Sequence, residues 1–174
     1  MLRIGGFQVF SKNLQPTVRL SVLFKSIVMN EQAQQLNISK RFATTRQNLF
    51  KAWTEEEQLK KWWKPMNKAL QHVENDIREG GRIVYTFNDN LNIHGEYKQA
   101  QEQERLVYSW IWDLPEDSHH KGEYLLTVTF KGDEQECELE VLQQNFKSEH
   151  SIQPHHEGWE KALQDLKNYL EGSK

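Results

Sequence analysis

Hydrophobic and polar residues alternate along the middle of this chain, between two segments whose apolar residues recur with helical spacing. The alternation is clearest at 106–113, where four large apolar side chains fall on one face: Leu106, Tyr108, Trp110 and Trp112. Turn residues such as Gly80–Gly81 and Asn88–Asn90 separate the alternating runs. The pattern predicts strands at 36–43, 70–77, 82–88, 93–100, 106–113, 123–130 and 136–141.

Two short helices are predicted directly after the first strand. The first covers 46–53 and has a threonine cap at position 44 or 45. The second begins at Thr54, which with Glu57 matches a capping box, and it ends at Pro65.

A longer helix is predicted from near Pro154 to Gly172, a residue suited to the end of a helix. Its apolar side chains form one continuous stripe: Trp159, Ala162, Leu163, Leu166, Tyr169 and Leu170. An amphipathic helix that follows an antiparallel meander buries its stripe on the sheet, and the two can enclose a pocket. The fold class is therefore α+β, with six to seven antiparallel strands packed on a long C-terminal helix.

Aromatic side chains are the expected wall of that pocket. The chain has six Trp, and their wide, flat surfaces are typical of a core or a cavity wall. We predict a ligand cavity lined by Trp63, Phe87, Tyr108, Trp110, Trp112 and Trp159. Ordinary core packing of the same side chains is the competing interpretation. Of the adjacent Trp62 and Trp63, one is expected to face the cavity mouth and the other to pack outside.

Composition narrows the class of protein further. The net charge of −3 argues against nucleic acid as the main partner. The single cysteine, Cys137, excludes an internal disulfide and favours a reducing compartment, so we expect a cytoplasmic protein. No stretch has the roughly 18 uncharged apolar residues that a membrane helix needs.

The first 28 residues differ from the rest, because they contain four Lys or Arg and no Asp or Glu. This basic composition resembles a transit peptide, and a misassigned start, with Met29 as the true first residue, is the alternative. We expect 1–28 to be a disordered extension that is separate from a single domain at 36–172.

Four separated segments resemble one protein family. They are FATTRQNLFKAWTEEEQLKKWWKP (42–65), IREGGRIVYTF (77–87), GEYKQAQEQERLVYSWIW (95–112) and GWEKALQDLKNYL (158–170). Together they resemble the family named for the activator of heat-shock-protein-90 ATPase, within the START-like (SRPBCC, helix-grip) superfamily. The resemblance covers roughly 36–172. It implies a curved antiparallel sheet around the last helix and an apolar cavity between them, and it associates the chain with stress response.

Residues for catalysis or metal binding are not evident. His119–His120 and His155–His156 are adjacent pairs without ligand spacing, and His155–His156 is expected to be a solvated first turn. His94 and Glu96 lie out of phase with Tyr97, and Asp113 lies out of phase with Trp112, so we expect all three to face solvent. We therefore predict no catalytic residues, no metal and no cofactor, and we interpret Cys137 as a small buried hydrophobe.

The resulting hypothesis is a non-catalytic protein that binds a small apolar or amphipathic ligand. An enzyme of the cyclase or dehydratase type, acting on an aromatic or polyketide-like substrate, is the first alternative. It requires a buried ionisable group that faces the pocket. Modulation of a chaperone ATPase through protein contact is the second, and it requires a large exposed apolar patch.

Overall fold

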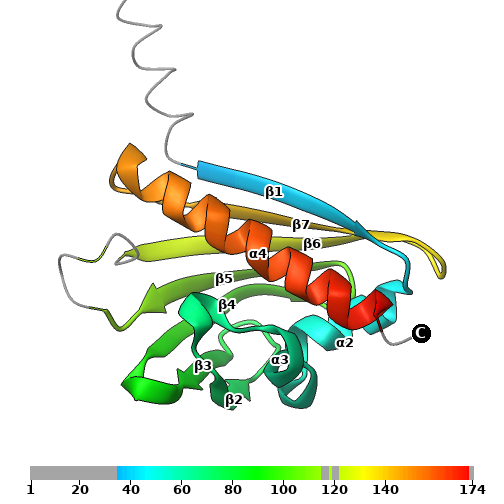
Figure 1. The fold of residues 1–174 in the computed structure, drawn as a ribbon, viewed down its shortest axis with the longest axis horizontal. Coiled ribbons are helices and arrows are strands. Elements are labelled where there is room, and N and C mark those ends of the chain that lie inside the picture. Colours follow the sequence, from blue (N-terminus) through cyan, green and yellow to red (C-terminus); the bar gives the residue numbers. More distant parts are fainter. Residues whose placement is uncertain (1–34, 115–117, 119–121, 173–174) are drawn as a thin grey trace, which may run out of the picture. The chain divides into compact units, whose positions relative to one another are not determined.

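The computed structural model describes residues 35–114, 118 and 122–172. Within these residues, seven antiparallel strands form one curved sheet in the order β1-β7-β6-β5-β4-β3-β2 (Figure 1). The strands are β1 (Gln35–Phe42), β2 (Leu70–Asn75), β3 (Arg82–Phe87), β4 (Asn92–Gln101), β5 (Arg105–Trp112), β6 (Glu123–Gly132) and β7 (Cys137–Gln144). The predicted α+β fold is confirmed, and the predicted extension at 1–28 lies outside the described residues.

The alternation of buried and accessible positions follows the predicted phase. In β5, Leu106, Tyr108, Trp110 and Trp112 are buried, and the residues between them are more accessible. Three strand ends differ from the prediction by two residues or more, and one of them is that of β6, which continues to Gly132. β2 stops at Asn75, because the Asp76 carbonyl accepts a turn hydrogen bond from the Arg78 N–H. β7 continues to Gln144, because it pairs with both β1 and β6 along its whole length.

Helices α2 (Arg46–Thr54) and α3 (Glu56–Trp62) follow β1. The Thr45 hydroxyl caps α2 by accepting a hydrogen bond from the Asn48 N–H at 3.1 Å. The predicted capping box at Thr54 is wrong. The Thr54 hydroxyl donates to the Phe50 carbonyl at 2.7 Å, which closes the last turn of α2. Glu55 occupies the N-cap of α3 and makes no side-chain cap.

The predicted Gly–Gly turn and a close strand approach both depend on glycine. Gly80 has a φ of +76°, a conformation that side chains disfavour, and it turns the chain between β2 and β3. Gly95 lies where β4 meets β5, and a Cβ atom there would stand 1.9 Å from the Ser109 carbonyl oxygen. The register of the same strand pair shifts between Tyr97 and Gln99. The close approach at Gly95 therefore lies beside an irregularity of the strand pair.

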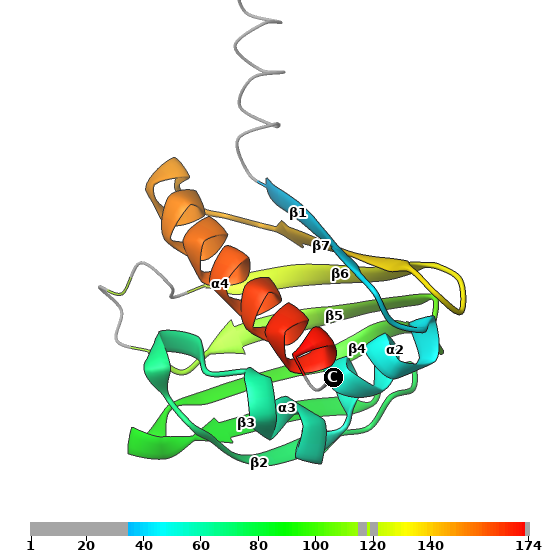
Figure 2. The same cartoon turned by 45° about the vertical axis from the view of Figure 1, so that its right-hand side comes forward.

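The long C-terminal helix, α4 (Ile152–Glu171), lies on one face of the sheet (Figure 2). It begins two residues before Pro154, which is tolerated because the first-turn N–H groups of a helix need no intrahelical acceptor. Its buried stripe is His155, Trp159, Leu163 and Leu166. Helix α4 packs against β1, α2 and α3, so its apolar stripe completes the core.

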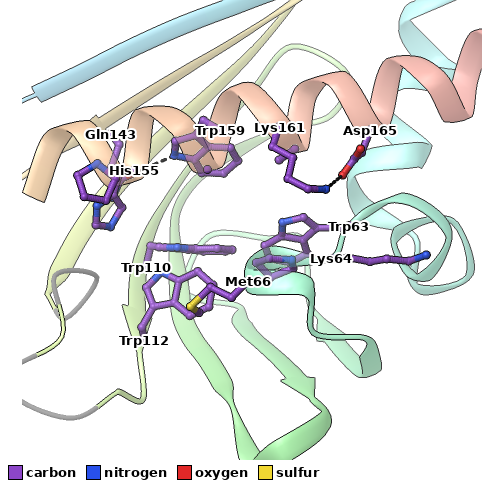
Figure 3. Close-up of a pocket in the computed structure, with 14 residues that line it drawn as sticks. Trp63, Lys64, Met66, Trp110, Trp112, Gln143, His155, Trp159, Lys161 and Asp165 are labelled. Carbon is purple, nitrogen blue, oxygen red and sulfur yellow. Dashed lines mark hydrogen bonds and ion pairs between the residues drawn. The ribbon is translucent and has the colours of Figure 1, made fainter.

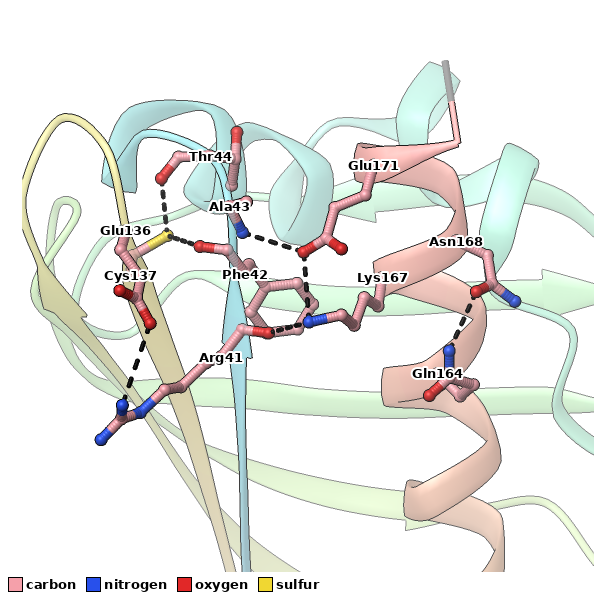
Figure 4. A network of polar contacts seen from close by, with 10 residues as sticks. All are labelled: Arg41, Phe42, Ala43, Thr44, Glu136, Cys137, Gln164, Lys167, Asn168 and Glu171. Carbon is pink, nitrogen blue, oxygen red and sulfur yellow. Dashed lines mark hydrogen bonds and ion pairs between the residues drawn. The ribbon is translucent and has the colours of Figure 1, made fainter. Parts of the chain in front are cut away.

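Polar contacts join the C-terminal end of α4 to the end of β1 (Figure 4). Lys167 donates from Nζ to the Arg41 carbonyl at 2.8 Å, and Glu171 Oε1 accepts the Ala43 N–H at 2.9 Å. The two side chains also form an ion pair with each other at 3.2 Å. We call Lys167 and Glu171 the C-terminal clasp.

Nearby, the Cys137 thiol donates to the Thr44 carbonyl at 3.2 Å. Burial raises the pKa of Cys137 to about 11, which fits the predicted role of a small buried side chain.

The clasp gives a first testable prediction. Glu171→Ala is expected to lower the free energy of unfolding by about 1 kcal/mol, because it removes a charge-assisted hydrogen bond at a partly exposed site. Urea unfolding measures this loss, and amide exchange at Ala43 should become faster. Gln164→Ala is the control, because Gln164 pairs only with Asn168 on the same helix. A clasp variant no less stable than this control would contradict the prediction.

Candidate ligand pocket

A pocket of about 100 Å³ opens between α4, β5 and the segment that follows α3 (Figure 3). Four tryptophans contribute to its wall, and we call it the tryptophan pocket. Its full lining is Trp63, Lys64, Pro65, Met66, Trp110, Trp112, Gln143, Pro154, His155, Gly158, Trp159, Lys161, Ala162 and Asp165.

The tryptophans reach the pocket from three different elements. Trp110 and Trp112 project from the same face of β5, with ring centroids 6.1 Å apart. Trp63 comes from the end of α3 and lies 5.5 Å from Trp110. Trp159 comes from α4 and lies 6.5 Å from Trp110. Trp110 is therefore the common neighbour, and the wall is a continuous set of contacting rings.

Both adjacent tryptophans at the end of α3 are buried, so the prediction that one packs outside is wrong. Helix α3 ends at Trp62, and Trp63 takes an extended conformation (φ −90°, ψ 106°), which redirects its side chain. Trp62 stacks on Trp53 and donates from Nε1 to the Ala52 carbonyl at 2.8 Å. Helical geometry does not apply to the second residue of the pair, and both rings turn inward.

The structure places the six predicted residues in three positions. Trp63, Trp110, Trp112 and Trp159 line the tryptophan pocket. Tyr108 lies deeper, beside a second cavity of about 10 Å³, which is about the minimum space for one water molecule. Phe87 lines neither cavity. It packs behind the wall, 5.4 Å from Trp63 and 6.4 Å from Trp112 between ring centroids.

A layer of buried tyrosines lies on the inner side of the wall. Tyr108 accepts a hydrogen bond from Trp53 Nε1 at 3.3 Å, and Tyr97 donates to Asn75 Oδ1 at 2.7 Å. Burial raises the pKa of Tyr97, Tyr108 and Tyr85 well above the ordinary tyrosine value. These phenols therefore stay neutral throughout the physiological range.

Two polar residues in the wall were not predicted. Gln143 lies on β7, and its Oε1 accepts a hydrogen bond from Trp159 Nε1 at 2.7 Å. His155 was expected in a solvated turn, but it is buried against the rings of Tyr124 and Phe146. The signals were present in the sequence. Gln143 continues the inward phase of β7, and His155 stands one helical turn before Trp159.

The geometry of His155 fixes its tautomer. Its Nδ1 lies 2.7 Å from the Ser151 carbonyl oxygen, which can only accept a hydrogen bond. Nδ1 therefore carries a proton in either charge state of the ring, and it donates to this carbonyl. Of the ionisable side chains that line the pocket, His155 alone is buried.

The rim of the pocket is polar and contains an unusual backbone segment. Lys161 and Asp165 form an ion pair one helical turn apart on α4 (Figure 3). Opposite them, Met66 is 44% exposed, and both Met66 and Asn67 have positive φ values of 50° and 58°. Two successive left-handed residues carry backbone strain, which is often found beside ligand sites.

The polar residues considered for catalysis lie elsewhere. His94, Glu96 and Asp113 are exposed, as strand phase predicts, and none of them lines the pocket. His94 Nδ1 is 3.5 Å from Asp113 Oδ1, and Glu96 pairs with Lys98. Within 35–114, 118 and 122–172, no three His, Cys, Asp or Glu side chains gather as a metal site requires. His119–His120 lies outside the described residues.

A curved antiparallel sheet that holds a long C-terminal helix over a pocket defines a START-like, helix-grip protein. Residues 43–171 match one family model of this class, described as "Activator of Hsp90 ATPase homolog 1-like protein", and the chain belongs to that family. A search of curated proteins gave no significant match.

Solved structures share the fold at low sequence identity. Protein CV1439 from Chromobacterium violaceum has a TM-score of 0.67 and 19% identity, over 79% of this chain and 98% of that one. CalU16 from Micromonospora echinospora has a TM-score of 0.60 and 20% identity, over 79% and 76% of the two chains. DynU16, a protein of the dynemicin biosynthetic locus, has a TM-score of 0.67 and 16% identity, over 81% of this chain and 48% of that one.

The helices of the described part of the chain were also compared with the requirements of a bilayer. None of them combines the length and the apolar character needed to cross one.

Proposed function

We propose that this protein binds a small, flat apolar or amphipathic molecule in the tryptophan pocket and does not change it chemically. The observation that carries the proposal is the wall of four contacting tryptophans beside unfilled space. Wide apolar surfaces supply binding energy in proportion to the area they bury, and flat rings pack against flat rings. The exposed positions of His94, Glu96 and Asp113 favour binding over catalysis.

The size of the pocket limits the ligand. An engineered apolar cavity of about 150 Å³ binds benzene, so about 100 Å³ accepts part of one ring system in the present conformation. A larger ligand has to project past the rim or displace it. Met66 is the exposed apolar side chain on that rim. A methionine side chain adapts readily to different shapes, which suits a rim that moves with the ligand.

A filled-pocket variant tests the proposal. Gly158 lies on the pocket-lining side of α4, and a Cβ added there would meet nothing within 4 Å. Gly158→Phe is expected to weaken the binding of indane, a bicyclic hydrocarbon, at least tenfold from a Kd on the order of 0.1 mM. Isothermal titration calorimetry measures both values.

The matched control is Gly158→Ala, which adds only a methyl group. Both substitutions replace a glycine inside a helix, so the alanine variant should be more stable than the parent by roughly 0.5–1 kcal/mol. Loss of binding in the phenylalanine variant then cannot be attributed to helix instability. An unaltered affinity for indane in Gly158→Phe, or no binding of indane by the parent protein, would refute the proposal.

A second candidate function is an enzyme that acts on an aromatic substrate. The burial of His155 in the pocket wall favours it, since histidine is the side chain that most often acts as a general base and this one lines the pocket. The likeness to DynU16 is compatible with this alternative. Turnover of a bound aromatic ketone that disappears in His155→Gln, while binding persists, would replace the binding proposal.

A chaperone partner gains no comparable support. Among the residues that the structure describes, Met66 is the one exposed large hydrophobic side chain, so no broad apolar patch is present there. The cytoplasmic location and the link to stress response stay predictions.

A further inference from the structure

The polar end of the tryptophan pocket contains two buried hydrogen-bond donors without a partner among the described residues. They are Gln143 Nε2 and Trp112 Nε1. Gln143 is 0% exposed and Trp112 is 7% exposed, and both line the pocket. In Figure 3 they lie with His155 on the side of the pocket away from Asp165. Leaving a buried donor unpaired costs about 1–3 kcal/mol, so two such donors in one wall require an explanation.

The orientation of the Gln143 amide is not arbitrary. An indole N–H can only donate, so the amide atom 2.7 Å from Trp159 Nε1 must be the oxygen. The NH₂ group is therefore turned away from Trp159 and has no acceptor. The indole of Trp112 can likewise only donate. Both unmatched groups are thus donors, and a complementary ligand must present an acceptor.

The charges around the pocket decide between a neutral and an anionic acceptor. Lys161 is paired with Asp165 at the rim, and Lys64 is exposed. No lysine or arginine that lines the pocket is buried. A carboxylate at the polar end would lose its hydration without gaining a buried cation, which is costly. A neutral carbonyl oxygen satisfies the donors at a much smaller desolvation cost.

We infer that the pocket selects flat apolar molecules that carry a neutral carbonyl oxygen on one edge, held by the Gln143 amide and the Trp112 indole N–H. This inference rests on the proposed function and adds the chemical class of the ligand. Both nitrogens are closed to solvent in this structure. Contact therefore requires side chains of the pocket wall to move aside when the ligand enters.

The test compares 1-indanone with indane, which differ only by one carbonyl group. Titrations followed by the indole ¹H–¹⁵N signals of the full chain give both dissociation constants. The parent protein is expected to bind 1-indanone about tenfold more tightly. In Gln143→Met the preference should fall to twofold or less, while the affinity for indane changes less than threefold. The spectrum of Trp112→Phe lacks one indole signal, which assigns that signal to Trp112. In the parent protein this signal should shift with 1-indanone and not with indane.

The outcomes separate the two levels of the proposal. Binding of both probes with equal affinity overturns the carbonyl inference and leaves the binding function intact. Binding of neither probe overturns both. Tighter binding of 1-indanecarboxylate than of 1-indanone overturns the preference for a neutral acceptor. Gln143→Met leaves Trp159 Nε1 without its acceptor. The affinities for 1-indanone and indane are therefore also compared in Trp112→Phe, in which the Gln143–Trp159 hydrogen bond stays intact. If this variant still binds 1-indanone tenfold more tightly than indane, Trp112 is excluded as a donor.

Discussion

Trp110→Ala is expected to lower the free energy of unfolding by about 3–5 kcal/mol, the usual cost of truncating a large buried aromatic side chain. Trp110 is 4% exposed and stands at the centre of the aromatic wall. Its ring contacts come from the sheet, the end of α3 and α4: Trp63, Tyr85, Tyr108, Trp112 and Trp159. The substitution removes all of these contacts and leaves a cavity that the rigid sheet cannot fill. Urea unfolding monitored by far-UV circular dichroism measures the loss.

The same variant tests whether the lost volume joins the pocket. Indole should restore part of the stability of Trp110→Ala, because a ligand that binds only the folded state stabilises it by mass action. Trp53→Ala is the control, since Trp53 lines only the small inner cavity. Its stability should also fall, but indole should restore less of it. A loss below 1 kcal/mol for Trp110→Ala would show that Trp110 is not the centre of the wall.

Alkaline pH is expected to destabilise the protein steeply. Tyr85, Tyr97 and Tyr108 have pKa values raised by burial, so in the folded state they retain their protons above pH 10. In the unfolded chain they ionise near pH 10. The unfolded state then binds fewer protons, and stability falls as pH rises. The loss is about 1.4 kcal/mol for each tyrosine between pH 9 and pH 11, or about 4 kcal/mol for the three, and most of it falls above pH 10, where the unfolded tyrosines are ionised.

A series of urea unfolding curves between pH 8 and pH 11.5 measures this dependence. Tyr85→Phe removes one of these groups and should reduce the slope above pH 10 by about 1.4 kcal/mol per pH unit. A stability that stays flat up to pH 11 would mean that the phenols ionise in the folded state.

Strand and helix phase could be predicted from the sequence because burial on one face imposes a strict period. The alternation in β5 placed Trp110 and Trp112 on the buried face, and the stripe of α4 placed Trp159 there. Periodicity assigns faces, but it does not assign depth along a face. For that reason Phe87 and Tyr108 were predicted in the pocket wall, although one packs behind it and the other lies beneath it.

The missed residues lie where periodic elements end. The β7 prediction stopped at Val141, so the inward position of Gln143 two residues later was not considered. His155 and His156 were interpreted together as a pair in a solvated first turn. Only His155 lies four residues before Trp159, a spacing that places it on the same buried face of the helix. Trp63 turned inward because the helix stopped one residue earlier. The end of an element decided the direction of the Trp63 side chain, whereas Gln143 and His155 follow the period of elements that extend past the positions considered from the sequence.

Gly95 lies outside the wall of the tryptophan pocket, but it holds β4 close to β5, the strand that carries Trp110 and Trp112. The backbone of β4 comes so near to Ser109 that not even a methyl group fits there, and the Glu96 N–H donates to the Ser109 hydroxyl at 2.9 Å. A glycine inside a strand often marks a bend, so we expect a larger residue at position 95 to move β5, and with it Trp110 and Trp112, relative to α4. Ligand preference could thus be changed by mutation at a distance, through the backbone alone.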